Sequence, residues 1–269
     1  MLVIIREDFE DMSREAGRLV AERLRRKPNL ILGLATGGTP LGLYGELIRL
    51  HREEGLDFSK VTTFNLDEYV GLPPEHPQSY HHFMHENLFR HLNVDARYIH
   101  IPAGMATDVE AHCEWYEEAI RRTGGIDLQV LGIGANGHIA FNEPASSLGS
   151  RTRVKTLTLQ TRQDNARYFG SVEKVPRYAL TMGIGTIMEA RELLLLASGE
   201  GKAEAIRAAV EGPITALVPA SMIQMHGRAF VIIDRAAASR LEHTQFYSRS
   251  LEEAVIQRRN TGRPSTVDS

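Results

Sequence analysis

The sequence predicts an α/β fold with one mostly parallel sheet that helices cover on both faces. Short apolar segments alternate along the chain with segments of helical periodicity, and this alternation is typical of such folds. The length of 269 residues suits a single core. Hydrophobic residues make up 42% and charged residues 24%, as in ordinary globular proteins. We expect one catalytic domain over residues 1–257 and a mobile polar tail over 258–269.

The first part of the chain begins with a helical pattern. Apolar residues recur at helical spacing from Phe9 to Leu24, and a basic run from Arg23 to Lys27 follows. The next expected elements are a strand at 29–35, a loop at 36–40, a helix at 41–51 and a strand at 61–66.

The remaining segments continue the alternation. We expect helices at 79–92, 108–122, 202–211 and 219–225, and strands at 98–101, 127–133, 178–182, 192–197 and 229–234. Ligands of such sheets bind at the carboxyl ends of the strands, so the loops that follow the strands are where site residues are expected.

Several classes of protein are disfavoured. No apolar run is long enough to span a bilayer, and the N-terminus lacks a signal peptide's basic region and cleavage site. The single cysteine, Cys113, has no internal partner for a disulfide, and we expect a buried structural thiol. We therefore expect a cytoplasmic protein that does not bind membranes. The net charge of −3 argues against a nucleic-acid partner.

A group of histidines occurs in one segment, at His76, His81, His82 and His85. These histidines suit either a metal site or a solvated or substrate-facing helix. No HExxH or comparable ligand spacing is present, so the helix is favoured and no metal is expected.

The segment 33–40, Gly-Leu-Ala-Thr-Gly-Gly-Thr-Pro, follows the first predicted strand of the sheet. Its consecutive glycines let backbone N–H groups turn toward an anion, and the following helix adds its positive end. A phosphate would suit this loop. The loop is not a P-loop, because no Gly-Lys-Ser/Thr follows, and taken alone a tight turn explains the pattern equally well.

Asp67 and Glu68 come directly after the strand at 61–66. A carboxylate there, screened from water by Tyr69 and Val70, suits a general base because burial raises its pKa. A helix N-cap is the alternative of equal weight.

The segment 132–144 follows another predicted strand, and its first six residues match G-x-G-x-x-G. A dinucleotide-binding loop is rejected because Pro144 interrupts the expected helix and no acidic residue follows about twenty residues on. His138 and Glu143 remain, and a carboxylate near an imidazole suits an acid/base group that opens a sugar ring.

A phosphate ligand also requires cations. The candidates are Arg167 and Lys202, which follows Ser-Gly-Glu-Gly and opens a helix. Solvated surface charges are the alternative for both.

Three segments together resemble the signature sequences of glucosamine-6-phosphate deaminases. They are Thr-Gly-Gly-Thr-Pro at 36–40, Phe-Asn-Leu-Asp-Glu-Tyr-Val-Gly-Leu at 64–72 and Gly-His-Ile-Ala-Phe-Asn-Glu-Pro-Ala-Ser-Ser at 137–147. The resemblance extends to about Asp234. It implies a modified Rossmann-type sheet, no metal and no redox cofactor. The implied reaction converts glucosamine 6-phosphate to fructose 6-phosphate and ammonia in amino sugar catabolism.

The resemblance also implies roles. Asp67 matches the base that moves a proton from carbon 2 to carbon 1 through an enolamine, and His138 matches the ring-opening acid/base that Glu143 supports. The residues that match the phosphate cradle are Gly38, Thr39, Arg167 and Lys202. Asn136 departs from the best-known bacterial form, which has aspartate here. An asparagine still holds the histidine by a hydrogen bond but does not share its titration, so we expect an altered pH profile.

Ser146, Arg153 and Lys155 match the subunit-interface site at which hexameric members bind the activator N-acetylglucosamine 6-phosphate. The basic cluster that includes Arg151 makes sense as an anion site, and an exposed basic strand without a ligand is the alternative. We favour the activator site and expect a homo-oligomer, with a hexamer favoured.

Two other functions are alternatives to the deaminase. A 6-phosphogluconolactonase would share the fold and need a phosphate cradle, but the Asp67 segment argues against it. A sugar-phosphate sensor would carry a DNA-binding helical module, which we do not expect in this sequence.

Overall fold

A computed structural model describes residues 1–250, so the tail expected at 258–269 lies outside the described residues. The described residues contain a seven-stranded sheet in which all neighbouring strands run parallel, as predicted. In spatial order its strands are β1 (Leu2–Arg6), β10 (Ala229–Asp234), β9 (Glu192–Ala197), β6 (Leu128–Leu131), β2 (Ile31–Leu34), β3 (Thr62–Asn65) and β5 (Ile99–His100).

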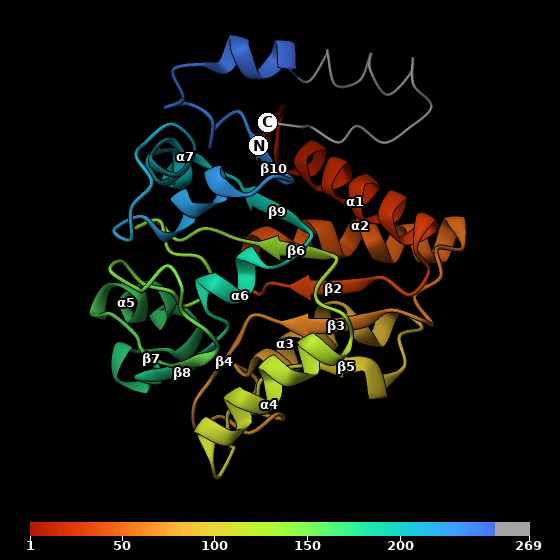
Figure 1. The fold of residues 1–269 in the computed structure, drawn as a ribbon, viewed down its shortest axis with the longest axis vertical. Coiled ribbons are helices and arrows are strands. Elements are labelled where there is room, and N and C mark those ends of the chain that lie inside the picture. The colour runs from red at the N-terminus through yellow and green to blue at the C-terminus, as the bar shows by residue number, and fades with distance from the viewer. Residues whose placement is uncertain (251–269) are drawn as a thin grey trace.

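Helices cover both faces of this sheet (Figure 1). The helices α1 (Phe9–Arg26) and α2 (Gly38–Glu54) pack against each other on one face. On the other face lies α4 (Val109–Arg122), whose Tyr116 ring meets the Phe64 ring of β3 edge to face. The α/β class with helices on both faces is therefore confirmed.

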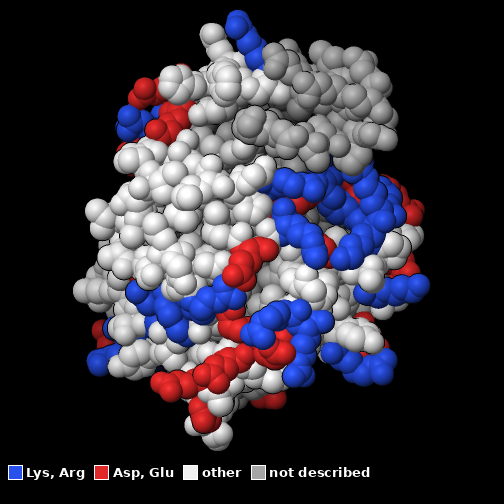
Figure 2. Space-filling view, in the orientation of Figure 1, with Lys and Arg blue, Asp and Glu red and all other residues white. Residues whose placement is uncertain are grey.

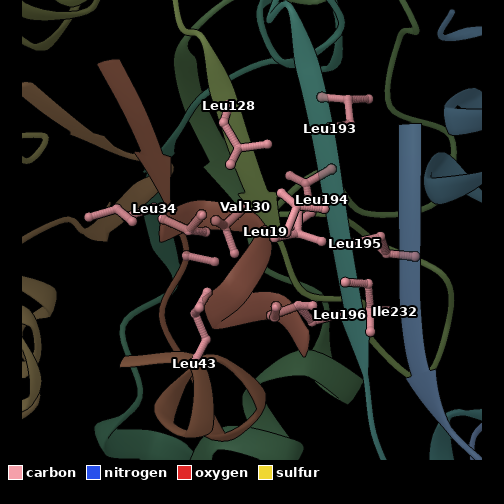
Figure 3. Packing of buried hydrophobic residues seen from close by; sticks show 14 of the residues in the cluster. Leu19, Leu34, Leu43, Leu128, Val130, Leu193, Leu194, Leu195, Leu196 and Ile232 are labelled. Atoms are coloured by element: carbon pink, nitrogen blue, oxygen red, sulfur yellow. The ribbon is translucent and has the colours of Figure 1, made fainter. Parts of the chain in front are cut away.

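The main core lies between the sheet and α1 and α2. The leucine-rich β9 is buried along its whole length, as expected of a central parallel strand. Figure 3 shows side chains of β2, β6, β9 and β10 beside Leu19 of α1 and Leu43 of α2. This packing gives the strand ends a rigid base.

A second sheet was not predicted. It is antiparallel and contains β4 (Asp67–Tyr69), β8 (Tyr178–Thr181) and β7 (Arg153–Thr156). Of these strands only β8 was expected. In Figure 1 this second sheet and α5 (Leu159–Phe169) lie beside the carboxyl ends of the strands of the main sheet.

Other elements depart from the prediction in detail. β1 was not expected, although its apolar residues pair with β10 from Leu2 to Arg6. The helix predicted at 79–92 divides into α3 (Tyr80–Asn87) and a 3₁₀ turn at Phe89–His91. The segment predicted as a helix at 219–225 is a 3₁₀ helix, Pro219–Met225. The helix predicted at 202–211 is α7 (Ala203–Val210) after the 3₁₀ turn Glu200–Lys202.

The remaining elements are α6 (Ile184–Met188) and two 3₁₀ turns, Ala96–Tyr98 and Val172–Lys174. No helix among residues 1–250 has both the length and the hydrophobicity needed to cross a bilayer. Cys113 is buried on α4, as expected, and burial raises the pKa of its thiol to about 11.

Candidate active site

A pocket lies at the carboxyl ends of β2, β3 and β6. The three loops that the sequence singled out line it together with α5 and the start of α7. The expected site residues on its wall are Gly38, Thr39, Asp67, His138, Arg167 and Lys202. Asn136 and Glu143 lie behind this wall, and Ser146, Arg153 and Lys155 lie outside it.

The loop after β2 enters α2 at Gly38. Gly37 has a φ of 104°, which favours glycine, and it directs the chain into the helix. Gly37 and Gly38 are exposed, and a Cβ placed on either would meet nothing within 4 Å. The free N–H groups at the start of this long helix therefore face open space that an anion can occupy.

Two cations line the same pocket from other elements. Lys202 is half-buried and donates from Nζ to the carbonyl oxygen of Ile133 at 2.8 Å. Burial lowers its pKa, and the Asp164 carboxylate acts in the opposite direction. Arg167 is exposed on α5, with its guanidinium 4.7 Å from the ring centroid of Tyr168. Both side chains can supply positive charge to a phosphate at the loop after β2.

Asp67 is the first residue of β4 and is 5% exposed. Burial raises its pKa well above the usual range, and the neighbouring Glu68 carboxylate adds to the effect. The N-cap alternative is wrong for Asp67, because Glu68 instead accepts hydrogen bonds from the first N–H groups of α3. A buried carboxyl with a raised pKa is suited to accept a proton from carbon.

His138 is tied to its neighbours by a short network. Asn136 donates from Nδ2 to Oε2 of Glu143 at 3.0 Å and accepts from the His138 backbone N–H at 3.2 Å. His138 Nδ1 lies 3.7 Å from Oε2 of Glu143. Thr158 donates to the other carboxylate oxygen through its N–H and its hydroxyl. The carboxylate is thus fixed beside the imidazole.

The electrostatics of this pair favour a neutral imidazole beside a carboxylate. Burial lowers the pKa of His138, and Glu143 partly offsets this. For Glu143, burial acts to raise the pKa, but hydrogen bonds from Thr161, Asn136 and Thr158 and the nearby His138 hold it below its usual value. A neutral histidine that a carboxylate can stabilise once protonated is suited to acid/base work.

The backbone around His138 explains the glycines of this segment. A Cβ on Gly134 would lie 2.2 Å from the His138 ring, so the imidazole packs where only a glycine fits. Gly137 has a φ of 82°, and Ala140 has a φ of 51°, which is uncommon for a residue with a side chain. The G-x-G-x-x-G match is therefore explained by histidine placement. No helix begins in this segment, in agreement with the rejection of a dinucleotide loop.

Several pocket residues were missed from the sequence. Aromatic side chains of Tyr80, Phe141 and Phe169 pack with Tyr69, which was expected to screen Asp67, in a second small core that also borders the pocket. The ring centroids of Tyr69 and Tyr80 lie 5.0 Å apart. These residues come from different elements, so no local pattern connects them. Asp164 lies three residues before Arg167, and this closeness to a predicted cation is the only feature of the sequence that points to it.

The residues proposed for an activator are less closely grouped. Ser146 is buried and its hydroxyl has no hydrogen-bond partner within the described residues. Arg153 donates to Oδ1 of Asn142 at 3.0 Å, while Arg151 is paired with Glu117 and Glu189. Arg153 borders a groove beside α4, whose lining includes neither Ser146 nor Lys155.

Metal-ligating side chains do not cluster in the part of the chain that the structure describes, where no three of them could share an ion. His81, from the histidine-rich segment, has its Nδ1 2.9 Å from Oε2 of Glu68.

The family described as glucosamine-6-phosphate isomerases/6-phosphogluconolactonase matches residues 7–232 of this chain. A curated relative from Thermoanaerobacter sp. (strain X514), a glucosamine-6-phosphate deaminase, is 53% identical over 239 residues. The match covers 89% of this chain and 94% of the relative.

Comparison with solved structures agrees with the sequence matches. A monomeric glucosamine-6-phosphate deaminase matches with a TM-score of 0.88 and 50% identity, over 89% of this chain and 100% of the other. A 6-phosphogluconolactonase from Trypanosoma cruzi matches with a TM-score of 0.71 over 90% of this chain and 97% of the other. Its identity is 19%, so it shares the fold alone.

Proposed function

Since the chain belongs to the family of glucosamine-6-phosphate deaminases, we propose that its pocket converts glucosamine 6-phosphate to fructose 6-phosphate and ammonia. The observation that carries this proposal is the placement of a buried carboxyl, Asp67, and an imidazole, His138, on one pocket wall. The same pocket holds a helix N-terminus and two cations, which suit a phosphate. The chain is thus an enzyme of amino sugar metabolism.

The phosphate end of the substrate anchors it. Gly38 and Thr39 offer N–H groups at the start of α2, and Lys202 and Arg167 line the same pocket. This arrangement supports charge-assisted contacts to the phosphate oxygens. Binding energy from this remote group then holds the sugar against the reacting side chains.

Ring opening is the first step. His138 takes the proton of the hydroxyl on carbon 1 while the bond from carbon 1 to the ring oxygen breaks, and the imidazolium then gives this proton to the ring oxygen. The neutral state favoured for His138 supports its role as the proton acceptor. Glu143, held by Asn136 and Thr158, stabilises the imidazolium that forms.

Isomerisation follows in the open chain. Asp67 removes the proton from carbon 2, the electrons form the enolamine, and the same proton is returned to carbon 1. The raised pKa of Asp67 supports this role because it gives the carboxylate more affinity for a carbon-bound proton. The resulting imine at carbon 2 adds water and releases ammonia, leaving fructose 6-phosphate.

The activator site and the hexamer stay predictions. A basic pair on β7, Arg153 and Lys155, supports an anion site there, while Ser146 lies outside the groove that Arg153 borders. Against an obligatory hexamer stands the similarity to a deaminase described as monomeric. Size-exclusion chromatography with light scattering, with and without N-acetylglucosamine 6-phosphate, distinguishes the two arrangements.

The test of the main proposal is a coupled assay of both products. The enzyme should release ammonia and fructose 6-phosphate in equal amounts from glucosamine 6-phosphate. Hydrolysis of 6-phosphogluconolactone, measured in parallel, should be absent. Lactone hydrolysis without ammonia release would replace this proposal by the lactonase function.

A further inference from the structure

Glu68 is a buried carboxylate that the reaction as described does not use. It follows Asp67 in β4, and none of it is exposed. Its oxygens accept hydrogen bonds from the N–H groups of Tyr69 at 2.8 Å, Tyr80 at 2.9 and 3.0 Å and His81 at 3.0 Å. The ring Nδ1 of His81 lies 2.9 Å away. Burying a carboxylate is costly, so a site with this many donors needs an explanation.

These contacts join two elements that meet at the pocket. Tyr80 and His81 are the first residues of α3, and their N–H groups are among those that a helix leaves unpaired. Ser79 caps the same helix end by accepting from His82 N at 3.0 Å. Glu68 therefore attaches the start of α3 to the strand that carries Asp67.

The attachment determines where Tyr80 lies. The Tyr80 ring packs 5.0 Å from the Tyr69 ring and stacks on Phe141 at 6.0 Å with an interplanar angle of 8°. Tyr80 also lines the pocket with Asp67. The aromatic wall beside the reacting carboxyl thus depends on a backbone that Glu68 holds.

The opposite side of Glu68 is closed by Gly104. A Cβ at this position would lie 2.1 Å from the carbonyl oxygen of Tyr69 and 3.2 Å from Cγ of Glu68. Gly71 donates to the Gly104 carbonyl at 2.9 Å. The chain therefore approaches β4 closely enough to keep water from the carboxylate.

We propose that Glu68 is a positioning residue for proton transfer at Asp67, because it fastens α3 to β4 and so fixes the aromatic wall and the carboxyl of one pocket. The inference rests on the proposed deaminase function. Glu68 is fully buried and does not line the pocket. It acts through the geometry of β4 and Tyr80 and through its negative charge next to Asp67.

The negative charge of Glu68 should affect the pH dependence of activity, which a purely structural role would leave unchanged. Asp67 must be ionised to accept a proton, and the charge of Glu68 adds to the burial that raises its pKa. Removing that charge moves the acid limb of activity to lower pH. The groups that face Asp67 are Glu68 and the phenols of Tyr44 on α2, Tyr69 on β4, Tyr80 on α3 and Tyr116 on α4. None of these phenols ionises in the range of that limb.

The first experiment compares Glu68→Gln with Glu117→Gln after the wild type has been shown to form both products. Glu117 is a matched control because it also accepts several hydrogen bonds, from Thr152 and Thr186, but does not line the pocket. Glu68→Gln should lower kcat by about 10- to 100-fold, with a smaller change in KM. Its acid limb should move to lower pH. Glu117→Gln should keep both properties.

A second pair of variants tests the positioning role of Glu68 if Glu68→Gln does not fold. His81→Ala removes one contact to Glu68, and His85→Ala removes an exposed ring from the same helix, where its partner is Glu86. His81→Ala should lower kcat about threefold or more relative to His85→Ala, because α3 is held less firmly.

The outcomes separate the two proposals. A wild type that forms no product would overturn the proposed function and this inference together. An active wild type in which Glu68→Gln matches Glu117→Gln in kcat and acid limb would overturn this inference alone. Equal kcat values for His81→Ala and His85→Ala would do the same where Glu68→Gln does not fold.

Discussion

The two ends of the main sheet carry similar charged side chains but pair them differently. At the amino ends, Asp127 accepts from Lys27 at 2.6 Å and from Arg191 at 2.7 Å. Glu192 is paired in the same way with Arg23 at 2.8 Å. Figure 2 shows Lys and Arg gathered with interspersed acidic residues on this side of the molecule, where the strands of Figure 1 begin.

At the carboxyl ends, Asp67 and Lys202 have no such charged partners among residues 1–250. Within the described part of the chain no cation pairs with Asp67, whose pKa burial and Glu68 raise. Lys202 is held only by a carbonyl oxygen there, and burial lowers its pKa. Paired charges stabilise the fold, while unpaired buried charges cost stability and remain free to act on a ligand. The same residue types thus serve structure at one end and chemistry at the other.

The largest effect is expected for Asp67→Asn, which should lower kcat about 1,000-fold because the proton acceptor is lost. The folded-state pKa of Asp67 is raised, so ionisation of Asp67 destabilises the fold as pH rises above the unfolded value of about 3.9. The variant should therefore melt at a higher temperature than the wild type at pH 7, and the difference should shrink toward low pH.

The matched change at the amino ends is Asp127→Asn. It should leave kcat unchanged and lower the free energy of unfolding by about 1–2 kcal/mol, because two cations lose a partner. Near-normal turnover in Asp67→Asn, or a large loss of turnover in Asp127→Asn, would break the comparison between the two ends.

The next effect concerns the phosphate. Lys202→Met should raise KM about 10- to 100-fold with little change in kcat, because a charge-assisted contact to a remote group is lost. Competitive inhibition by inorganic phosphate should weaken in parallel. Lys27→Met, which removes the part-buried ion pair with Asp127 at the other end of the sheet, should leave KM at the wild-type value.

A smaller effect is expected for Gly134→Ala. The added methyl group would overlap the His138 ring and shift it, so kcat should fall about 10-fold. Gly45→Ala is the control, since a Cβ there meets nothing within 4 Å and Gly45, on α2, does not line the pocket. Steady-state kinetics on both variants measure the difference, and equal kcat values would show that the ring position is not limiting.

The smallest effect is expected for Asn136→Asp, which would place a second carboxylate 3.0 Å from Glu143. Two carboxylates at this distance share a proton, and the added charge also raises the pKa of His138. The acid limb of the pH profile should move to higher pH while the maximal rate changes little. Asn87→Asp, on α3 outside the pocket, should not move it.

Part of the fold was predictable because it depends on local patterns. The strands at 192–197 and 229–234 agree with β9 and β10 residue for residue, since continuous apolar runs identify buried parallel strands. In contrast, β4 has three residues and β7 has four, so the alternation of charged and β-branched side chains in β7 is too short to recognise. The mostly polar α5 was missed for the same reason.

The chemistry of the site was predictable to the extent that single loops carry it. The segments around Asp67 and His138 each contain a reactive side chain beside residues that shape its surroundings, and both lie in one pocket. Tyr80 and Asp164, which line the same pocket, were missed because each depends on neighbours more than ten residues away in the sequence.

The sequence by itself determined the α/β class, the order along the chain of the loops that follow the central strands, and the residue types for which we propose the chemistry. Each of these follows from periodicity or from a short motif. The tertiary structure alone decided which charges are paired and which are not. That decision depends on distances between segments such as α1 and β6 or β4 and α3, and it separates Asp127, with its two cations, from Asp67, with none among the described residues. Burial and pairing set the pKa of a carboxyl, and both are properties of the packed chain.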